Sequence, residues 1–342
     1  MKKCIRTIGI TFNLKREKLS DDRQEEYDEI ETVEALKAEI ESYGFKVILL
    51  EQRDAFLKDL LKSKPDFVLN IAEGRSNTRS RESEIPSILE SLNIPYSGSD
   101  PISLGITLDK YLTNIILNAK GVPVPFMFMV KNSEEISFLK HIFKNIDYFI
   151  VKPRWEGSSK GIFLNSIVSD LKQLKKRIRF ITSRYSQPAL VEEFLPGDEF
   201  TVGVLGNGER IRILGMMKIS YRRQLSKFFI YSLEVKREWQ KNVRYEPEDK
   251  IPFDIRKNLE KYALEAFRIL ELRDIARIDM RLDSNGLPKI IDINPLPGLS
   301  PLYSDLPILY KLKGGSYSGL IKVILEEAFL RYGFKIKLIK RK

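Results

Sequence analysis

The chain has 342 residues, 58 of them basic and 47 acidic, with one histidine, His141, and one cysteine, Cys4. A single histidine excludes multi-histidine zinc sites, and a single cysteine excludes internal disulfides and cysteine clusters. We therefore expect a cytoplasmic protein whose chemistry depends on carboxylates, lysines, arginines, hydroxyls and a bound cofactor. The length and the hydrophobic fraction of 43% predict two or three domains with ample cores.

The net charge of +11 is concentrated at the C-terminal end of the sequence. Arg331–Lys342 holds six basic and no acidic residues, which leaves +5 on the rest of the chain. Such a tail is usually solvated, and no zinc spacing or interleaving of basic and aromatic residues accompanies it, so we expect no specific nucleic-acid partner. The longest apolar run, Val122–Val130, contains two prolines and is too short to span a bilayer, so we expect no membrane partner.

The first hundred residues alternate between strand and helix patterns. In chain order the expected elements are a strand at Thr7–Thr11, a helix at Asp22–Tyr43 ended by Gly44, a strand at Lys46–Leu50, a helix at Ala55–Leu61 and a strand at Phe67–Ile71. This order predicts a parallel sheet with right-handed crossovers. Ligands of such sheets bind beyond the carboxyl ends of the strands, which here are Phe12–Arg16 and Ala72–Arg81.

A turn-rich break at Asn93–Pro101 precedes the remaining elements, and we place a domain boundary between about residues 98 and 122. The expected elements are a helix at Leu108–Lys120, a helix near Glu134–Phe143, strands at Tyr148–Val151 and Ile162–Asn165, and helices at Ile255–Leu270 and Ser318–Arg331. His141 lies on the second of these helices, where we expect a surface position without a chemical role.

Two strand patterns, Arg277–Asp283 and Lys289–Asn294, flank Asn285-Gly286, which predicts a type I′ hairpin turn. In that register Asp279 faces Asp292 and Arg277 faces Asn294, all on one face of the ribbon. Like charges directly opposite each other destabilise a hairpin, and a Mg²⁺ site would explain them. The alternative is a solvated ribbon whose aspartates pair with Arg281 or Lys289, and the hairpin by itself leaves both interpretations open.

Three further segments have either a nucleotide-binding or a plain structural interpretation. Arg154–Gly161 follows the strand that carries Lys152, and its N–H groups and hydroxyls could close over phosphates, although an ordinary hairpin turn has the same composition. Lys110 begins a helix and could be a surface lysine. Glu192–Gly197 ends a strand at a rigid turn, where extended backbone can offer hydrogen bonds to an adenine edge.

The motifs occur in one order: L-D-K at 108–110, V-K-P at 151–153, E-G-S-S-x-G at 156–161, V-E-E-F-L-P-G-D-E-F-T-V at 191–202, A-R-I-D at 276–279 and I-D-I-N-P-L-P-G at 291–298. Together, over residues 65–330, they closely resemble the D-alanine–D-alanine ligase family of ATP-grasp enzymes. The resemblance implies an α/β and α+β chain with the ATP-grasp fold. Its parts would be an N-terminal Rossmann-like parallel-sheet domain at 1–105, a central ATP-grasp subdomain with the phosphate-covering loop at 106–190, a C-terminal ATP-grasp subdomain with the metal site at 191–332 and a basic tail at 333–342.

The resemblance also implies roles for individual residues. The implied ATP-binding residues are Lys110, Lys152, Glu156, Gly157, Ser158, Ser159, Gly161, Glu192, Glu193, Phe194, Leu195, Glu199 and Lys236. The implied metal ligands are Asp279, Asp292 and Asn294, which would hold two Mg²⁺ ions, with Mn²⁺ as a substitute. The resemblance therefore favours the metal-site interpretation of the hairpin over the interpretation in which the hairpin is a solvated ribbon. The implied catalytic residues are Arg277, Gly298, Ser158 and Lys236, of which the first two would stabilise a tetrahedral intermediate.

The implied reaction is an ATP-dependent ligation of a carboxylate to an amine through an acyl phosphate, with ADP and phosphate released. The amino-acid side departs from the family pattern. Arg237 replaces the tyrosine after the mobile-loop lysine, and Tyr303 replaces the serine five positions past the oxyanion glycine. No ammonium-binding glutamate can be carried over, and the candidates by position are Glu25, Glu26, Asp28 and Glu29.

We therefore expect a D-alanine–D-alanine ligase-like enzyme that forms a peptide bond between amino acids, with the departures from the family pattern confined to its amino-acid sites. Two alternatives stay open: a true D-alanine–D-alanine ligase of cell-wall synthesis, and a non-catalytic ATP-binding regulatory protein. Family members commonly form dimers, but no feature of the sequence decides whether this chain does.

Overall fold

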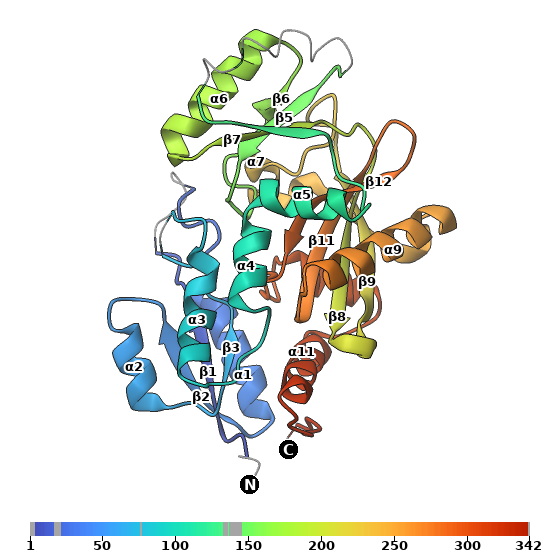
Figure 1. Cartoon of the computed structure of the whole chain (residues 1–342). Helices are drawn as coiled ribbons and strands as arrows, with labels where there is room; N and C mark the ends of the chain where they lie inside the picture. The colour runs from blue at the N-terminus through green and yellow to red at the C-terminus, as the bar shows by residue number, and fades with distance from the viewer. Residues whose placement is uncertain (1–3, 17–21, 76, 133–135, 137–145, 341–342) are drawn as a thin grey trace.

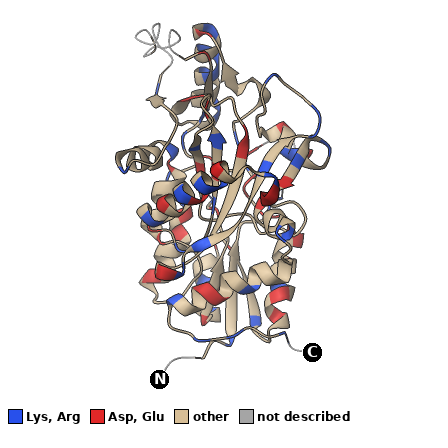
Figure 2. Ribbon diagram, turned by 90° about the vertical axis from the view of Figure 1, so that its right-hand side faces the viewer, with Lys and Arg blue, Asp and Glu red and all other residues tan. Residues whose placement is uncertain are grey.

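The structure is a computed structural model that describes residues 4–16, 22–75, 77–132, 136 and 146–340. It contains three sheets, which are separated along the long axis of the molecule in Figure 1. A three-stranded sheet lies at the end that carries both termini, a four-stranded sheet lies at the opposite end, and a five-stranded sheet lies between them. The described residues contain no helix long and apolar enough to cross a membrane. Basic and acidic side chains are interspersed over most of the ribbon (Figure 2).

The N-terminal sheet has the order β2-β1-β3, and all pairs are parallel, which confirms the expected βαβαβ unit. Its elements are β1 (Thr7–Phe12), α1 (Ile30–Ser42), β2 (Lys46–Glu51), α2 (Phe56–Ser63), β3 (Phe67–Asn70) and, after it, α3 (Glu84–Ser91). Helix α1 begins eight residues later than expected. The chain before it forms turns, because Asp28 donates its N–H to Asn13 O and accepts from Lys15 N.

The expected helix at Leu108–Lys120 is confirmed as α5 (Lys110–Ala119), and a further helix that was not expected, α4 (Pro101–Leu108), precedes it. Pro101 begins helix α4 and does not lie in the expected turn. Asp100 caps this helix by accepting a hydrogen bond from Ser103 N, and proline in the first helical turn is a start signal. Buried Asp109 separates the two helices and caps α5 through Leu112 N. Lys110 therefore stands at the helix start, as predicted.

The four-stranded sheet has the order β4-β7-β5-β6 and packs against α6 (Leu171–Tyr185). Its strands are β4 (Met127–Val130), β5 (Phe149–Pro153), β6 (Ile167–Val168) and β7 (Ala189–Glu193). The expected strand Ile162–Asn165 was wrong, because Leu164–Ser166 forms a 3-10 turn and the strand follows it. Apart from Ile136, the expected helix Glu134–Phe143 with His141 lies outside the described residues.

The five-stranded antiparallel sheet has the order β10-β9-β8-β11-β12. Its strands are β8 (Glu199–Gly206), β9 (Arg212–Tyr221), β10 (Val243–Pro247), β11 (Asp274–Leu282) and β12 (Pro288–Asn294). Helix α9 (Phe253–Ile269) covers one face, and α10 (Asp305–Leu312) and α11 (Tyr317–Arg331) cover the other. The short helices α7 (Leu233–Arg237) and α8 (Trp239–Asn242) lie between β9 and β10 in the chain.

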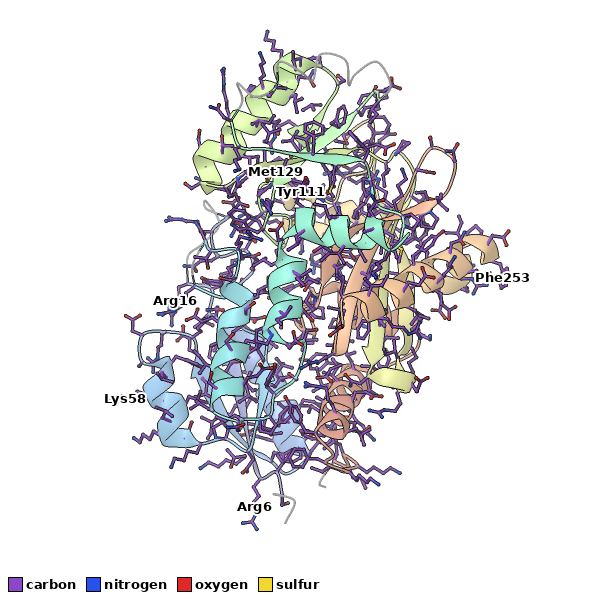
Figure 3. All side chains as sticks on the ribbon, in the orientation of Figure 1. Arg6, Arg16, Lys58, Tyr111, Met129 and Phe253 are labelled. Carbon is purple, nitrogen blue, oxygen red and sulfur yellow. The ribbon has the colours of Figure 1, made fainter. Side chains whose placement is uncertain are left out.

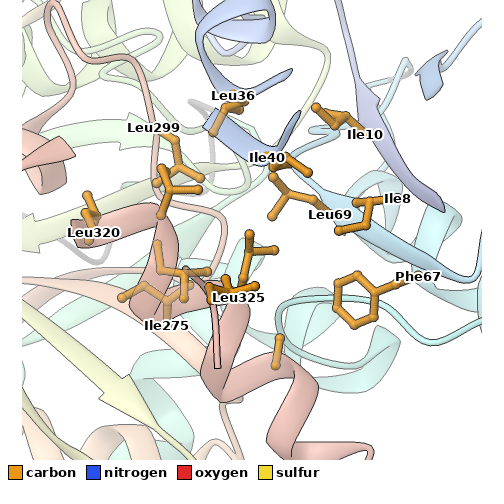
Figure 4. Packing of buried hydrophobic residues seen from close by; sticks show 14 of the residues in the cluster. Ile8, Ile10, Leu36, Ile40, Phe67, Leu69, Ile275, Leu299, Leu320 and Leu325 are labelled. Atoms are coloured by element: carbon orange, nitrogen blue, oxygen red, sulfur yellow. The ribbon is translucent and has the colours of Figure 1, made fainter. Parts of the chain in front are cut away.

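One hydrophobic core joins the two ends of the chain. Ile8 of β1 and Phe67 of β3 share it with Leu325 of α11 (Figure 4), and Phe67 packs edge-on against Phe329 with ring centroids 4.8 Å apart. Arg331 adds a polar connection, because it donates to Tyr96 O and forms an ion pair of 2.8 Å with Asp274. The N-terminal sheet and one face of the five-stranded sheet are therefore a single packed unit.

The basic tail packs against this core, which corrects the expectation of a solvated end. Leu338 is only 2% exposed and donates its N–H to Glu326 Oε1. Lys340 forms an ion pair of 3.0 Å with Glu39 of α1. Part of the net positive charge is thus held by acidic groups of the chain itself.

Candidate nucleotide and substrate site

The acidic hairpin has the predicted facing pairs. Asp279 lies opposite Asp292, and Arg277 lies opposite Asn294, across β11 and β12. The turn is different from the prediction, because Asp283 N donates to Leu287 O and only Gly286, not Asn285, has a positive φ. A three-residue loop of this kind shifts the register by one residue, and an irregularity after Asp279 restores it.

An open cavity lies between the four-stranded and the five-stranded sheets. The predicted site residues that line it are Lys110, Lys152, Glu156, Ser158, Ser159, Glu192, Glu193, Phe194, Leu195, Glu199, Lys236, Arg277, Asp279 and Asp292. Of the remaining four, Gly157, Asn294 and Gly298 line adjoining cavities, and Gly161 lines none of these. The fold thus brings together predicted site residues that are up to 182 positions apart, namely Lys110 and Asp292.

The floor of this cavity is made of ion pairs. Lys110 Nζ lies 2.6 Å from Asp292 Oδ1, and Lys152 Nζ lies 2.7 Å from Glu192 Oε2. Burial by itself would raise the pKa of Asp292, but the charges of Lys110 and Lys152 lower it below its ordinary value. The two lysines predicted to hold phosphates are therefore each bound to a carboxylate of the chain itself.

Asp279 is paired with Arg277, whose guanidinium lies 2.9 Å from its carboxylate, and it accepts a further hydrogen bond of 2.7 Å from Thr201. The alternative in which Arg281 or Lys289 pairs with the two aspartates is thus wrong. Arg281 pairs with Glu199 at 2.9 Å, and Lys289 pairs with Glu193 at 3.2 Å.

Sequence reasoning missed that Arg281 lines this cavity beside Phe194 and Leu195. Its Nε donates to Leu195 O, and its guanidinium lies 4.6 Å from the centroid of the Phe194 ring. Burial raises the pKa of Glu199 to about 7, although the charge of Arg281 opposes this shift. The signal was present in the period-two pattern of β11, because Arg281 shares a face with Arg277 and Asp279.

The small-residue loop after β5 is held over the cavity by a buried group of four charged side chains, which we call the flap cluster: Glu26, Arg81, Glu156 and Lys160. Arg81 lies 2.7 Å from Glu26, whose Oε1 also accepts from Gly157 N. Burial raises the pKa of Glu26, but Arg81, Lys160 and the Gly157 N–H outweigh it and bring the pKa to about 2. Sequence reasoning missed Arg81 and Lys160, because no local pattern connects these segments.

The geometry of the loop explains its small residues. Ser158 and Ser159 have φ values of 47° and 61°, and Gly161 has 72°. A Cβ at Gly161 would lie 2.4 Å from the ring of Pro153, so only glycine fits there. At the start of the loop, Arg154 pairs with Asp109 at 2.7 Å and donates a hydrogen bond to Met129 Sδ. Met129 lies beside Tyr111 in Figure 3.

A second open cavity adjoins the first and is lined partly by the same side chains, namely Ser158, Lys236, Arg277 and Asp305. The positional candidates Glu25, Glu26, Asp28 and Glu29 all line it, as do the replacement residues Arg237 and Tyr303. We call it the substrate cavity. Lys236 lies between the two cavities, where burial lowers its pKa. Asp305 was missed; it pairs with Arg277 at 3.6 Å and accepts from Tyr231 and Tyr245 at 3.1 Å.

The comparisons with known proteins agree with this geometry. The family model described as D-ala D-ala ligase C-terminus matches residues 116–326. A D-alanine--D-alanine ligase of Thermotoga sp. is 30% identical over 309 residues, which cover 89% of this chain and 93% of that protein. The chain belongs to the D-alanine–D-alanine ligase family. An uncharacterized protein of Sinorhizobium fredii is also 30% identical, over 87% of this chain and 88% of its own length.

The fold is the ATP-grasp fold, as predicted. The crystal structure of the D-alanine--D-alanine ligase of Bacillus anthracis complexed with ATP superposes with a TM-score of 0.74 at 23% identity, covering 96% of this chain and 98% of that one. As a member of the D-alanine–D-alanine ligase family, the chain is an ATP-dependent, ADP-forming ligase. The family does not by itself identify the amino acids that this chain joins.

Proposed function

We propose that the chain forms a peptide bond between two amino acids in the cytoplasm, with ATP in the first cavity and the amino acids in the substrate cavity. The observation that supports this most directly is the shared wall of the two cavities. Ser158, Lys236 and Arg277 line both of them, so a γ-phosphate bound near these side chains would lie next to a substrate carboxylate. Placing both reactants in one continuous space is a large part of such catalysis.

In this proposal Lys110 and Lys152 bind the phosphates of ATP, and the loop from Glu156 to Gly161 covers them. Phe194, Leu195 and the adjacent glutamates would contact adenine, with Glu199 near the ribose. Asp279, Asp292 and Asn294 offer two carboxylates and an amide oxygen, the hard ligands that Mg²⁺ prefers. The described residues contain no group of three or more His, Cys, Asp or Glu side chains that could hold a metal ion. In this proposal phosphate oxygens complete the coordination. Two bound Mg²⁺ ions would neutralise charge on the β- and γ-phosphates.

The chemistry then needs no histidine. One oxygen of the substrate carboxylate attacks the γ-phosphorus, the bond to the β-phosphate oxygen breaks, and ADP leaves. The amine of the second amino acid, having lost a proton, attacks the acyl carbon, and inorganic phosphate departs with its oxygen. Arg277 and the N–H of Gly298 would stabilise the negative oxygen formed in this step, a contribution of roughly 3–4 kcal/mol.

The side chains around the substrate cavity favour substrates other than two D-alanines. Arg237 is bound to Glu25, with Nε 2.7 Å from Oε1, and Tyr303 lies where the family places a substrate-binding serine. The second candidate function is D-alanyl-D-alanine synthesis, which the similarity to the D-alanine--D-alanine ligase of Thermotoga sp. supports. A purely regulatory ATP-binding role is disfavoured by the retained Arg277, Asp279 and Asp292.

The test measures ADP release in a coupled assay that contains ATP, Mg²⁺ and panels of D- and L-amino acids. The mass of each product is then measured. We expect amino-acid-stimulated ADP and phosphate release in equal amounts. The Asp279→Asn variant is the matched control and should release neither. Stimulation by D-alanine alone would establish the second candidate. Folded protein that releases no ADP with any amino acid would contradict the proposed function.

A further inference from the structure

Arg281 of β11 is a buried arginine in the wall of the first cavity, and the proposed reaction gives it no role. Its side chain is only 5% exposed, and it lines the cavity together with Phe194 and Leu195. A charged group that is removed from water is costly unless its hydrogen-bonding atoms find partners. The partners of this guanidinium therefore indicate what the arginine does.

Each nitrogen of the Arg281 guanidinium binds a different segment of the chain. Nε donates to Leu195 O at 2.5 Å, in the turn between β7 and β8. Nη1 donates to Glu199 Oε2 of β8 at 2.9 Å, and Nη2 donates to Phe229 O at 2.7 Å, in the segment that leads to α7. A planar fork of diverging donors can hold three separate acceptors, which the single ammonium group of a lysine cannot do.

The guanidinium of Arg281 is also fixed by aromatic rings. Its central carbon lies 4.6 Å from the ring centroid of Phe194 and 5.9 Å from that of Phe229. Arginine stacks on aromatic faces, and the contact restrains the plane of the guanidinium. The directions of its N–H groups are therefore set by the rings as well as by the three acceptors.

Arg281 binds the carbonyl of Leu195 and leaves the N–H of the same residue free. Leu195 is only 2% exposed, and its N–H donates to none of the described residues. A buried N–H without an acceptor is rare in proteins, and a ligand atom that accepts a hydrogen bond would satisfy it. The position of this N–H depends on the carbonyl that Arg281 holds.

Arg281 likewise binds one carboxylate oxygen of Glu199 and leaves the other free. Oε2 accepts from the arginine, whereas Oε1 accepts no hydrogen bond from the part of the chain that the structure describes. The side chain of Glu199 is 9% exposed and lines the same cavity. The ion pair therefore keeps the carboxylate in one orientation, with one oxygen available to accept from a hydroxyl group.

We propose that Arg281 is a positioning residue for the nucleoside part of ATP, which holds the Leu195 N–H towards N1 of adenine and Glu199 Oε1 towards a ribose hydroxyl. This inference rests on the proposed function, which places ATP in the first cavity. N1 of adenine is an acceptor, whereas N1 of hypoxanthine and of guanine carries a hydrogen. A fixed N–H therefore favours ATP over ITP and GTP, because two donors that face each other both stay unsatisfied.

The experiment compares Arg281→Lys and Arg281→Met with the wild type in the release of nucleoside diphosphate from ATP, ITP and 2′-deoxy-ATP. Lysine keeps the charge and can pair with Glu199, but it cannot also hold Leu195 O and Phe229 O. We expect Arg281→Lys to lose roughly tenfold of the preference in kcat/KM for ATP over ITP and to keep the preference over 2′-deoxy-ATP. Arg281→Met should lose both preferences, and kcat at saturating ATP should change little in either variant.

The matched control is Arg212→Met on β9. This variant removes an ion pair of 2.7 Å with Glu327, and neither residue lines the two cavities, so it should leave all the preferences unchanged. Thermal unfolding shows whether each variant is folded, and Arg281→Lys, which retains the charge, decides the inference if Arg281→Met does not fold. Folded Arg281 variants that are less stable but keep both wild-type preferences would mean that the arginine is only structural, and would overturn the inference.

The proposed function and this inference can fail separately. If no amino acid stimulates ADP release, the proposed function fails, and calorimetric titration of the same three nucleotides into the same proteins still decides the inference. Tighter binding of ATP than of ITP that is lost in Arg281→Lys supports it. Equal binding of ATP and ITP by the wild type, or no nucleotide binding at all, contradicts it.

Discussion

Lys110 Nζ lies 2.6 Å from Asp292 Oδ1, so the lysine proposed for phosphate and the aspartate proposed for metal neutralise each other. Lys110 lies at the start of α5 and Asp292 lies on β12, and the side chain of the lysine is only 9% exposed. Binding of Mg²⁺ and ATP as proposed would exchange this one ion pair for two, lysine with phosphate and aspartate with metal. The pair thus keeps both groups charged and in place.

Replacement of Lys110 by methionine tests this exchange. Without the lysine, Asp292 loses its closest cation and lies opposite Asp279, so we expect the free energy of unfolding to fall by about 2 kcal/mol. Mg²⁺ alone should then raise the midpoint of thermal unfolding more in Lys110→Met than in the wild type, because the ion takes over the role of the lysine. The matched control is Lys58→Met on exposed α2, and an equal Mg²⁺ response in all three proteins would contradict the metal assignment.

Replacement of Glu26 by glutamine tests the flap cluster. The variant leaves Arg81 and Lys160 to share Glu156 as an ion-pair partner, with the more distant charges of Glu82 and Glu73 on Arg81 alone, and we expect a loss of about 3 kcal/mol of stability at pH 7. Because the folded-state pKa of Glu26 is about 2, below the ordinary value of 4.5, the stabilisation is complete above pH 4.5 and is lost as the pH falls towards 2. Urea unfolding at several pH values should show the difference between wild type and variant shrinking below pH 4.5. A difference that does not depend on pH would contradict this origin.

Replacement of Gly298 by alanine tests the proposed oxyanion contact. An added Cβ would lie 2.7 Å from Ser304 Oγ, so the backbone or the serine must move. We expect kcat to fall roughly tenfold to hundredfold, with the KM for ATP nearly unchanged. The double variant Gly298→Ala/Ser304→Ala removes the clashing oxygen and should recover part of the loss. Wild-type kcat in the single variant would exclude Gly298 from the reaction.

Replacement of Leu338 by alanine tests the docking of the C-terminal segment. Leu338 is 2% exposed within the shared core, and its truncation should cost about 2 kcal/mol or more. Ile339 is 70% exposed, so Ile339→Ala is a control at the neighbouring position and should change stability little. Removal of Lys335–Lys342 should lower the unfolding midpoint and leave the KM for ATP unchanged. Equal stability of the two single variants would mean that the tail is solvated after all.

Much of the site could be predicted because its residues lie in local patterns. The pairing of Asp279 with Asp292 followed from the period-two alternation of two strands. It was correct although the predicted turn type was wrong, because the irregularity after Asp279 reverses the one-residue register shift that the loop introduces. Lys110 was placed at a helix start by its sequence neighbours alone. Local patterns of this kind depend on a few adjacent residues, which a sequence displays directly.

The missed features depend on contacts between distant segments. Arg81 and Lys160 bind Glu26 across 55 and 134 positions of sequence, and nothing in the local composition of any one segment indicates the others. The strand expected at Ile162–Asn165 failed for a related reason, because Arg177 of α6 donates to Gly161 O and to Ser166 Oγ and holds that segment in a turn. Tertiary hydrogen bonds outweighed local β-propensity there.

The core shared by β1, β3 and α11 has a consequence for motion. Opening the molecule between its N-terminal and five-stranded sheets would expose Phe67, Phe329 and their neighbours to water and would break the Arg331–Asp274 pair. The buried residues of the separate core of the four-stranded sheet lie between Val130 and Val191. Rotation of that sheet alone would separate Lys160 from Glu26 and Tyr148 from Phe228, and it would leave both cores intact. By this argument the molecule would move as two bodies although it has three sheets, and we expect the cavity between them to open when the smaller body swings away from the larger.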